Sequence, residues 1–338
     1  MAGALHDVQG PVAFKDAVAA DQAIADPAHH AEHNALISGL PARISYNVPV
    51  RYYQGFWMME RWARGFMAMQ RSFVARDDDI VLASVPKSGT TWLKALAFAT
   101  MARDRCPPSN MDHPLRRLNP HDCVPFIEGM FTLGLEAHMN QLPSPRLLAT
   151  HMPLSLLPSS IASSAGCKIV YIYRDEKDRA VSLWHFVKHV QPDLSFSEVY
   201  ESICNGTCVC GPVWDHILEY WKASNVNPNG VLFLKYENVL QDPCNSVRML
   251  ADFLGVPFSV AEEEVGVLTD IVDLCRLDNL RNLKDKKESS QGLTVKFSHD
   301  SFFRKGMAGD WVNHMTPEMA ERLDAILREK HKENGFTV

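Results

Sequence analysis

Residues 80–92 read Ile-Val-Leu-Ala-Ser-Val-Pro-Lys-Ser-Gly-Thr-Thr-Trp, a mostly apolar run followed by a short polar turn. A short continuous run of β-branched and aliphatic residues is typical of a strand that is buried on both faces. Gly89 allows a tight turn, and the residues from Thr90 onward have helical spacing. A strand that turns into a helix in this way points several backbone N–H groups and the helix dipole at one place. The stretch therefore predicts a strand, a turn and a helix that together bind an anion.

Three further apolar runs also end in polar residues. Residues 146–150 lead into His151, residues 168–173 into Arg174-Asp175, and residues 231–234 into Lys235-Tyr236-Glu237. Four such runs, with helical segments between them, predict an α/β fold with a central parallel β-sheet flanked by helices. Ligands of such sheets bind beyond the carboxyl ends of the strands, where all four polar groups are expected.

The composition indicates an ordinary globular protein. The chain has 338 residues, of which 46% are hydrophobic and 22% charged, and no composition shift marks a linker. We therefore expect one domain over residues 46–338. Residues 1–45 are rich in Ala, Asp and His without a sustained period, and we expect them to form a mobile or loosely packed arm.

Charge and sequence patterns argue against several classes of protein. The net charge of −6 leaves no overall positive field, so we expect no nucleic-acid partner and no membrane binding. No secretory signal is evident at the start and no apolar run is long enough to span a bilayer, so a cytoplasmic protein is expected. The eight cysteines lack the paired spacing of a zinc site, and we expect free thiols and no metal.

Two other interpretations of residues 84–92 have to be weighed. Gly89 could serve only a tight turn, with Thr90 or Thr91 as a helix cap. A nucleotide triphosphatase or kinase is the stronger rival. However, Lys87 precedes the glycine, unlike the G-x-x-x-x-G-K-[ST] pattern, and no apolar run ends in a clear Mg²⁺-binding aspartate.

Several motifs together resemble the cytosolic sulfotransferases, closest to the plant branch that acts on flavonols, steroids and hydroxyjasmonates. Residues 86–92 are similar to the 5′-phosphosulfate loop of that family, residues 171–182 to its 3′-phosphate segment, and residues 302–311 to its late R-K-G-x-x-G-D-W signature. Residues 150–153 (Thr-His-Met-Pro) are similar to the stretch that carries the family's base. The resemblance covers about residues 50–335 and implies a P-loop-like nucleotide-binding sulfotransferase fold.

The resemblance implies a cofactor and its contacts. The donor would be 3′-phosphoadenosine 5′-phosphosulfate (PAPS), with adenosine 3′,5′-bisphosphate (PAP) as product and no metal required. The implied cofactor-binding residues are Lys87, Ser88, Gly89, Thr90 and Thr91 at the 5′-phosphate, Trp92 and Tyr236 at adenine, and Arg174, Ser182, Arg304, Lys305 and Gly306 at the 3′-phosphate. A phosphate dianion in an acidic protein needs several converging cations, which agrees with this assignment.

Catalysis is assigned to His151, Lys87 and Ser182. One histidine among fourteen is more often structural, but the unperturbed pKa of His151 and its place after a strand suit a general base. Lys87 can stabilise charge on the leaving phosphate, and the resemblance implies that Ser182 restrains Lys87.

The acceptor is expected to be a small hydroxylated molecule such as a flavonoid, a steroid or a hydroxylated hormone. Aromatic character suggests Phe56, Trp57, Phe126 and Phe186 as its contacts, and family position also supports Phe126 and Phe186, although each ring could equally belong to the core. The family's dimerisation pattern is poorly kept around Thr294-Val295, so a monomer or weak homodimer is expected. A nucleotide-dependent kinase and a catalytically silent nucleotide-binding module remain the alternative functions.

Overall fold

Four parallel strands form the central sheet of the computed structural model, which describes residues 10–18, 31–163, 166–283, 290–291, 297–332 and 334–336. The strand order is β5-β4-β6-β7, and the strands are β4 (Ile80–Ala83), β5 (Leu147–Thr150), β6 (Lys168–Tyr173) and β7 (Val231–Lys235). Every neighbouring pair in this sheet is parallel. The predicted parallel sheet is confirmed, with strand ends within two residues of the expected runs.

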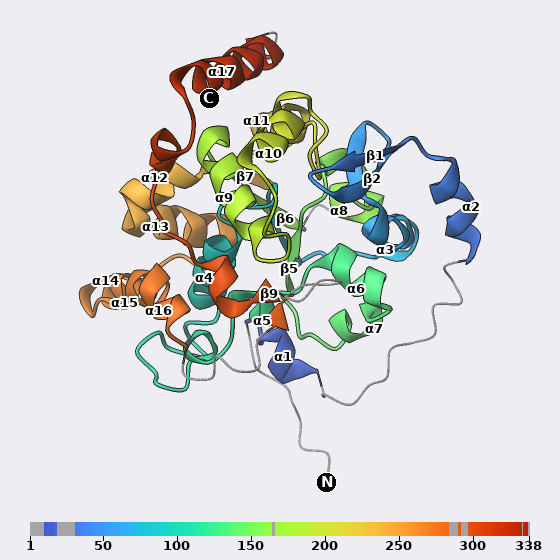
Figure 1. The fold of residues 1–338 in the computed structure, drawn as a ribbon. Helices are drawn as coiled ribbons and strands as arrows, with labels where there is room; N and C mark the ends of the chain where they lie inside the picture. The colour runs from blue at the N-terminus through green and yellow to red at the C-terminus, as the bar shows by residue number, and fades with distance from the viewer. Residues whose placement is uncertain are drawn as a thin grey trace.

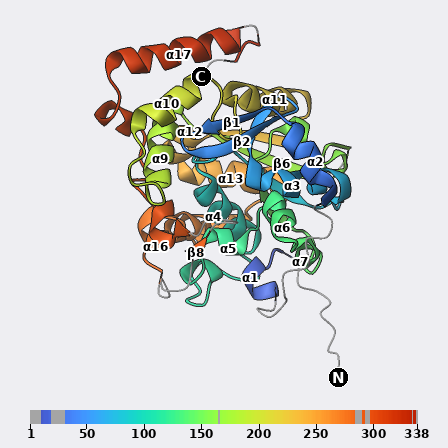
Figure 2. The same cartoon turned by 45° about the vertical axis from the view of Figure 1, so that its right-hand side comes forward.

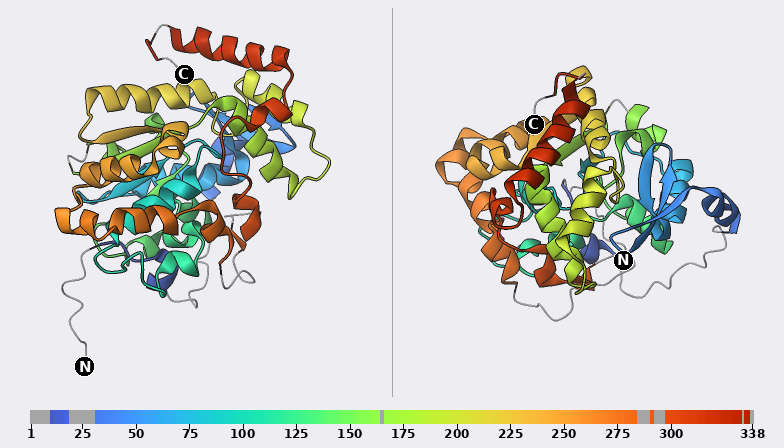
Figure 3. Two further views of the ribbon diagram at one scale, coloured as in Figure 1. Left: turned by 90° about the vertical axis from the view of Figure 1, so that its left-hand side faces the viewer. Right: turned by 45° about the horizontal axis from the view of Figure 1, so that its top comes forward.

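Helices cover both faces of this sheet. Ile80 and Leu82 point into one core, which contains residues of α4 (Thr90–Met101), α13 (Pro243–Leu254) and α15 (Val267–Leu274). Val81 and Ala83 point into the other core, which contains residues of α3 (Glu60–Ser72), α6 (Ile127–Leu133), α9 (Glu176–Lys188), α10 (Phe196–Cys204) and α11 (Val213–Val226). Figures 1 and 3 show α13 and α15 on one side of the sheet, with α3 and α6 on the other. Because successive side chains of a strand point to opposite faces, a run without polar gaps is what two cores require.

The remaining helices are short or peripheral. They are α1 (Phe14–Ala17), α2 (Ala31–Gly39), α5 (Pro120–Cys123), α7 (Glu136–Met139), α8 (Ser159–Ser163), α12 (Tyr236–Gln241), α14 (Val260–Glu264), α16 (Leu277–Arg281) and α17 (Pro317–Lys332). The last of these, α17, packs on α11 and α9 at the edge of the molecule (Figure 2). None of the helices within the described ranges is long and apolar enough to cross a membrane.

A second, antiparallel sheet was not predicted. It consists of β1 (Ala42–Ser45), β2 (Val48–Tyr53) and β3 (Phe56–Met59), and β3 is bridged to Gly211 through Trp57. A short pair, β8 (Ser290–Gln291) and β9 (Phe297–Ser298), is also antiparallel.

The segment 1–45 is described only in part. Within it, α1 contacts α5 and Asp16 forms an ion pair with Arg117, while β1 belongs to the antiparallel sheet. Residues 1–9 and 19–30 lie outside the described residues, so the mobility of the arm stays a prediction. Thr294-Val295 of the dimerisation pattern also lie outside them.

A buried ion pair fixes the start of the sheet. Arg146 precedes β5 and Asp79 precedes β4, and their side chains are 1% and 0% exposed. The guanidinium donates from Nε to Oδ1 at 2.7 Å and from Nη2 to Oδ2 at 2.5 Å. This two-point bond joins the two strands just before their first paired residues.

Candidate active site

One large cavity opens at the carboxyl edge of the parallel sheet. Its volume is about 1520 Å³. Each of the four strands contributes to its wall through the residues that follow it: Lys87 after β4, His151 after β5, Arg174 after β6 and Tyr236 after β7. The polar groups expected at this edge are therefore brought to one place.

The turn after β4 has the backbone shape of an anion-binding loop. Lys87 and Gly89 both have positive φ, at 75° and 104°. Gly89 is the N-cap of α4 and makes no side-chain capping bond, and Thr90 instead pairs with Ser84 through their hydroxyls at 2.6 Å. A Cβ on Gly89 would lie 2.7 Å from Cδ2 of Tyr236, so only glycine fits here. The first N–H groups of α4 consequently remain available to a ligand.

Lys87 lies among aromatic rings, with no counter-ion among the described residues. Its Nζ is 4.0 Å from the ring centroid of Phe186 and 5.8 Å from that of Phe302. Burial, together with the positive charges of Arg174 and Arg304, lowers the pKa of Lys87 to about 7. No hydrogen bond or ion pair joins the Lys87 ammonium to another described residue, Ser182 included. A bound anion would favour the charged amine.

The ring of His151 is held in one tautomer. Its Nδ1 lies 2.7 Å from the carbonyl oxygen of Ser84, which can only accept, so Nδ1 carries the proton. In the neutral ring Nε2 therefore keeps a lone pair. Burial is the main reason that the pKa of His151 falls to about 3, which keeps the ring neutral at physiological pH. His151 also lies beside Phe126, with 4.5 Å between the ring centroids.

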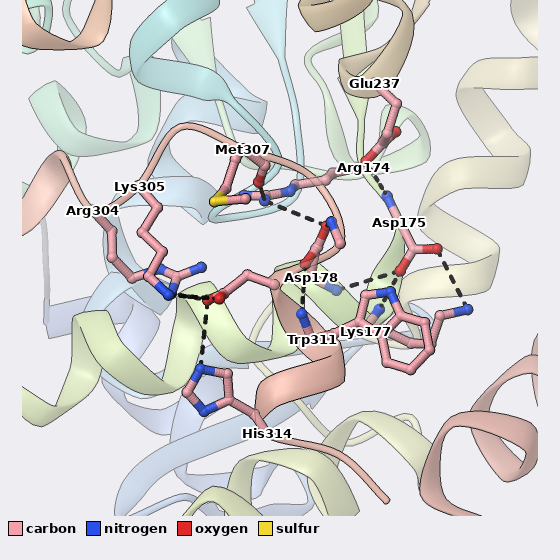
Figure 4. Close-up of polar contacts among 12 residues, drawn as sticks. Arg174, Asp175, Lys177, Asp178, Glu237, Arg304, Lys305, Met307, Trp311 and His314 are labelled. Carbon is pink, nitrogen blue, oxygen red and sulfur yellow. Dashed lines mark hydrogen bonds and ion pairs between the residues drawn. The ribbon is translucent and has the colours of Figure 1, made fainter. Parts of the chain in front are cut away.

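Arg174, Arg304 and Lys305 line a cationic end of the cavity, and the carboxylates of Asp178 and Asp310 form ion pairs with them from outside its lining. Figure 4 shows Arg174, Asp178, Arg304 and Lys305 in this cluster. Lys305 donates to Oδ1 of Asp310 at 2.6 Å, and Arg304 donates to its Oδ2. Arg174 is 6% exposed, donates to the Met307 carbonyl at 2.8 Å, and lies 3.7 Å from Asp178.

The backbone of this cationic end is fixed by Asp178. The carboxylate of Asp178 accepts from the backbone N–H of Gly309 at 2.6 Å and from that of Trp311 at 3.1 Å. These bonds tie α9 to the segment that carries Arg304 and Lys305.

The other predicted site residues fall into two groups. Gly89, Thr90, Thr91, Trp92, Ser182, Gly306, Phe126 and Phe186 all line the cavity. Ser88, Phe56 and Trp57 do not. Ser88 is 1% exposed beneath the loop, Phe56 packs edge-on to His216, and Trp57 packs against Tyr52. The rings of β3 thus contribute to packing between β3 and its neighbours.

Several polar residues of the site were not singled out from the sequence. Lys94 and His121 are hydrogen-bonded to each other, and His121 also contacts Thr91. Glu128 is buried and accepts the backbone N–H of His151 at 2.8 Å. A lysine inside an otherwise apolar helix was the available signal for Lys94, because a buried charge needs a specific partner.

His216 supports His151 from behind. Its Nε2 lies 3.2 Å from the His151 carbonyl, and its Nδ1 lies 3.0 Å from the hydroxyl of Tyr171. Since the carbonyl can only accept, Nε2 carries the proton and Nδ1 accepts from Tyr171. Within the described ranges, no group of three or more His, Cys, Asp or Glu residues could hold a metal ion.

Comparison with known proteins gives one consistent family. The sulfotransferase domain family matches residues 77–335. Cytosolic sulfotransferase 5 of Arabidopsis thaliana is 42% identical over 314 residues, which are 90% of this chain and 96% of the relative.

Solved structures agree with this result. An Arabidopsis thaliana protein, described only provisionally as a steroid sulphotransferase, has a TM-score of 0.74 and 37% identity, and the match covers 95% of this chain and 100% of that one. A mouse sulfotransferase complexed with PAP has a TM-score of 0.63 and 26% identity, covering 84% and 95%. The motifs, the parallel sheet, the cavity at its carboxyl edge and these matches together establish that the chain belongs to the sulfotransferase family.

Proposed function

We propose that this chain transfers a sulfuryl group from PAPS to a hydroxyl of a small hydrophobic acceptor. The observation that carries the proposal is the shared cavity: the neutral ring of His151, the ammonium of Lys87 and the cations Arg174, Arg304 and Lys305 all line it. A base, a cation for the leaving group and a remote phosphate site are the three parts that such a transfer requires.

The residues present fit a doubly phosphorylated nucleotide. At one end, the uncapped start of α4 and the glycine at position 89 leave room for a phosphate against backbone N–H groups. At the other end, Nε of Arg174 is buried without a hydrogen-bond partner among the described residues, and an anion would satisfy it. Between them, Trp92 and Tyr236 form an aromatic pair with ring centroids 5.7 Å apart, which suits a purine.

The catalytic roles follow from protonation states. PAPS, when bound, supplies the activated sulfuryl group. His151 Nε2 is the ring nitrogen with a free lone pair, so we assign it the proton of the acceptor hydroxyl. We propose that Lys87 stabilises the negative charge that develops on the leaving phosphate. Its ammonium has no competing carboxylate within ion-pair distance among the described residues. Ser182 lines the same wall and is proposed to hold Lys87 or the phosphate.

The acceptor pocket is proposed to lie between Phe126 and Phe186. Phe126 contacts the ring of His151, and Phe186 lies under the Lys87 ammonium, so a flat apolar acceptor between them would bring its hydroxyl to both groups. Because the Arabidopsis relative is named a cytosolic sulfotransferase, we propose that this chain is also cytoplasmic. We further propose that it is a monomer or weak homodimer and that it acts without a metal.

Calorimetry and turnover separate this proposal from its alternatives. Titration with PAP, ATP and ATP plus Mg²⁺ should show binding of PAP, whereas preferential binding of ATP with Mg²⁺ would indicate a kinase. Radiolabelled PAPS should then be offered with phenols, steroids and hydroxylated acids. PAP binding without turnover of any acceptor would indicate a silent module. The His151→Ala variant is the matched control, because it should bind PAP but transfer the sulfuryl group at least about a hundredfold more slowly.

A further inference from the structure

Helix α4, which follows the phosphate loop, carries a buried lysine without an ion-pair partner among the described residues. Lys94 on α4 is 0% exposed, and no carboxylate of the described residues lies within ion-pair distance of it. Its Nζ donates to the Val124 carbonyl at 2.8 Å and lies 3.1 Å from Nδ1 of His121. The same Nζ lies 3.4 Å from the ring centroid of Phe126. Burying a lysine to this degree is costly unless hydrogen bonds satisfy its amine, as the Val124 carbonyl and His121 do here.

The hydrogen bond from Lys94 to His121 determines which nitrogen of His121 donates to Thr91. A lysine nitrogen has enough protons to donate to both the Val124 carbonyl and His121 Nδ1. When His121 Nδ1 accepts, the neutral ring carries its proton on Nε2. Nε2 lies 3.0 Å from Oγ1 of Thr91, so the ring donates to that oxygen. The hydroxyl proton of Thr91 is then free to point at another acceptor.

The surroundings keep the His121 ring neutral and in place. Burial, followed by the charge of Lys94, lowers the pKa of His121 well below its usual value, and His151, Lys87 and His299 add to this effect. The ring stacks on Phe126 with centroids 5.5 Å apart and lies 4.7 Å from the centroid of Phe302. His121 and Thr91 both line the cavity.

We propose that Lys94 and His121 form a hydrogen-bond relay that turns the Thr91 hydroxyl outward, to donate to the 5′-phosphate of the bound nucleotide. This inference rests on the proposed function, and it makes Lys94 and His121 positioning residues. The neighbouring threonine provides a contrast. Thr90 pairs with Ser84 inside the fold at 2.6 Å, so its hydroxyl is engaged and lies outside the relay.

A double-mutant cycle on PAP affinity tests the relay. Thr91→Val should weaken PAP binding about tenfold or more, because a hydrogen bond to a charged group is lost. His121→Phe keeps the stacking ring and should also weaken binding. The double variant should bind no more weakly than Thr91→Val alone, because without the hydroxyl the relay has nothing to orient. In a Thr90→Val background, by contrast, the effect of His121→Phe should persist in full.

Rescue and a direct observation of the ring complete the test. His121→Gln returns a donor near the Nε2 position and should recover most of the lost affinity. Nitrogen NMR of the wild-type chain should show His121 protonated on Nε2. If His121→Phe does not unfold cooperatively, and so is not properly folded, this NMR measurement alone tests the relay. Additive losses in the Thr91 cycle, or an Nδ1-protonated ring, would overturn the relay. A wild-type chain that does not bind PAP would instead refute the proposed function, while the NMR result would still report on the relay.

Discussion

Replacing Arg174 with methionine tests where the 3′-phosphate binds. Arg174 is 6% exposed and donates one N–H to the Met307 carbonyl, while its Nε has no hydrogen-bond partner among the described residues. Methionine keeps an unbranched, though shorter, side chain and removes the charge and the donors. Asp178 keeps its bonds from Gly309 and Trp311, so the segment should stay folded.

The expected loss follows from the bonds that are removed. A hydrogen bond between charged groups contributes about 1.5–3 kcal/mol, and each 1.4 kcal/mol is a factor of about ten in affinity. The dissociation constant for PAP should therefore rise about 10- to 150-fold in the Arg174→Met variant. A loss near the upper end is expected, because the Arg174 side chain is only 7% exposed and its proposed partner is a dianion.

The assay compares two ligands that differ only at the 3′ position. Calorimetric affinities of the wild type and Arg174→Met are measured for PAP and for adenosine 5′-monophosphate, which lacks the 3′-phosphate. The loss should be confined to PAP. Arg248→Met, which removes an exposed arginine paired with Glu263 away from the cavity, controls for the change in net charge. Equal losses for both ligands in Arg174→Met would refute the placement of the 3′-phosphate beside Arg174.

The other predictions concern the base, the cation and the fold. His151→Ala should keep PAP binding within about threefold yet lose at least about a hundredfold in kcat, the usual contribution of a general base, and near-normal turnover would remove His151 from that role. In a pH–rate profile, kcat/KM should stay level between about pH 5 and 7, because His151 with a pKa of about 3 is already neutral, and should fall above about pH 7 as Lys87 deprotonates. The corresponding limb of kcat should lie at higher pH, because an anionic donor raises the pKa of Lys87, and coincident limbs would contradict this linkage. Arg146→Met should lower the free energy of unfolding in urea by about 3–5 kcal/mol, because it leaves Asp79 buried and unpaired, and a change below about 1 kcal/mol would show that the pair is dispensable.

The central sheet could be predicted because its strands are patterned locally. Strand β4 is buried at all four of its consecutive apolar positions, which alternate between the two cores, so its burial can be read directly from the sequence. The residues that follow the strands can then be placed as well, because parallel strands all end at the same edge of the sheet. This is why Lys87, His151, Arg174 and Tyr236 could be grouped from sequence, and the cavity lining brings them together as expected.

Contacts between distant segments could not be predicted in the same way. The Lys94–His121 bond joins residues 27 positions apart, and no spacing rule relates a helix interior to a four-residue helix. The rings of Phe56 and Trp57 have the composition of an acceptor pocket, but their strand pairs with β2 and with Gly211, and packing decides which way they face. Aromatic residues serve cores and pockets alike, so residue type alone does not separate the two.

The cations at the two ends of the cavity differ in whether a carboxylate pairs with them, and this difference has a chemical consequence. At one end, Asp310 accepts hydrogen bonds from Arg304 and Lys305. Burial alone would raise the pKa of Asp310, but these two bonds hold it well below its usual range. Under the proposed function, carboxylates there hold the cations in place for a phosphate that binds but does not react. At the other end, Lys87 and His151 lack such a partner among the described residues, and their pKa values are lowered to about 7 and 3. Under the proposed function, a carboxylate beside Lys87 would neutralise the charge that has to stabilise the leaving phosphate. An ammonium that stays unpaired until the anionic donor binds would therefore favour catalysis.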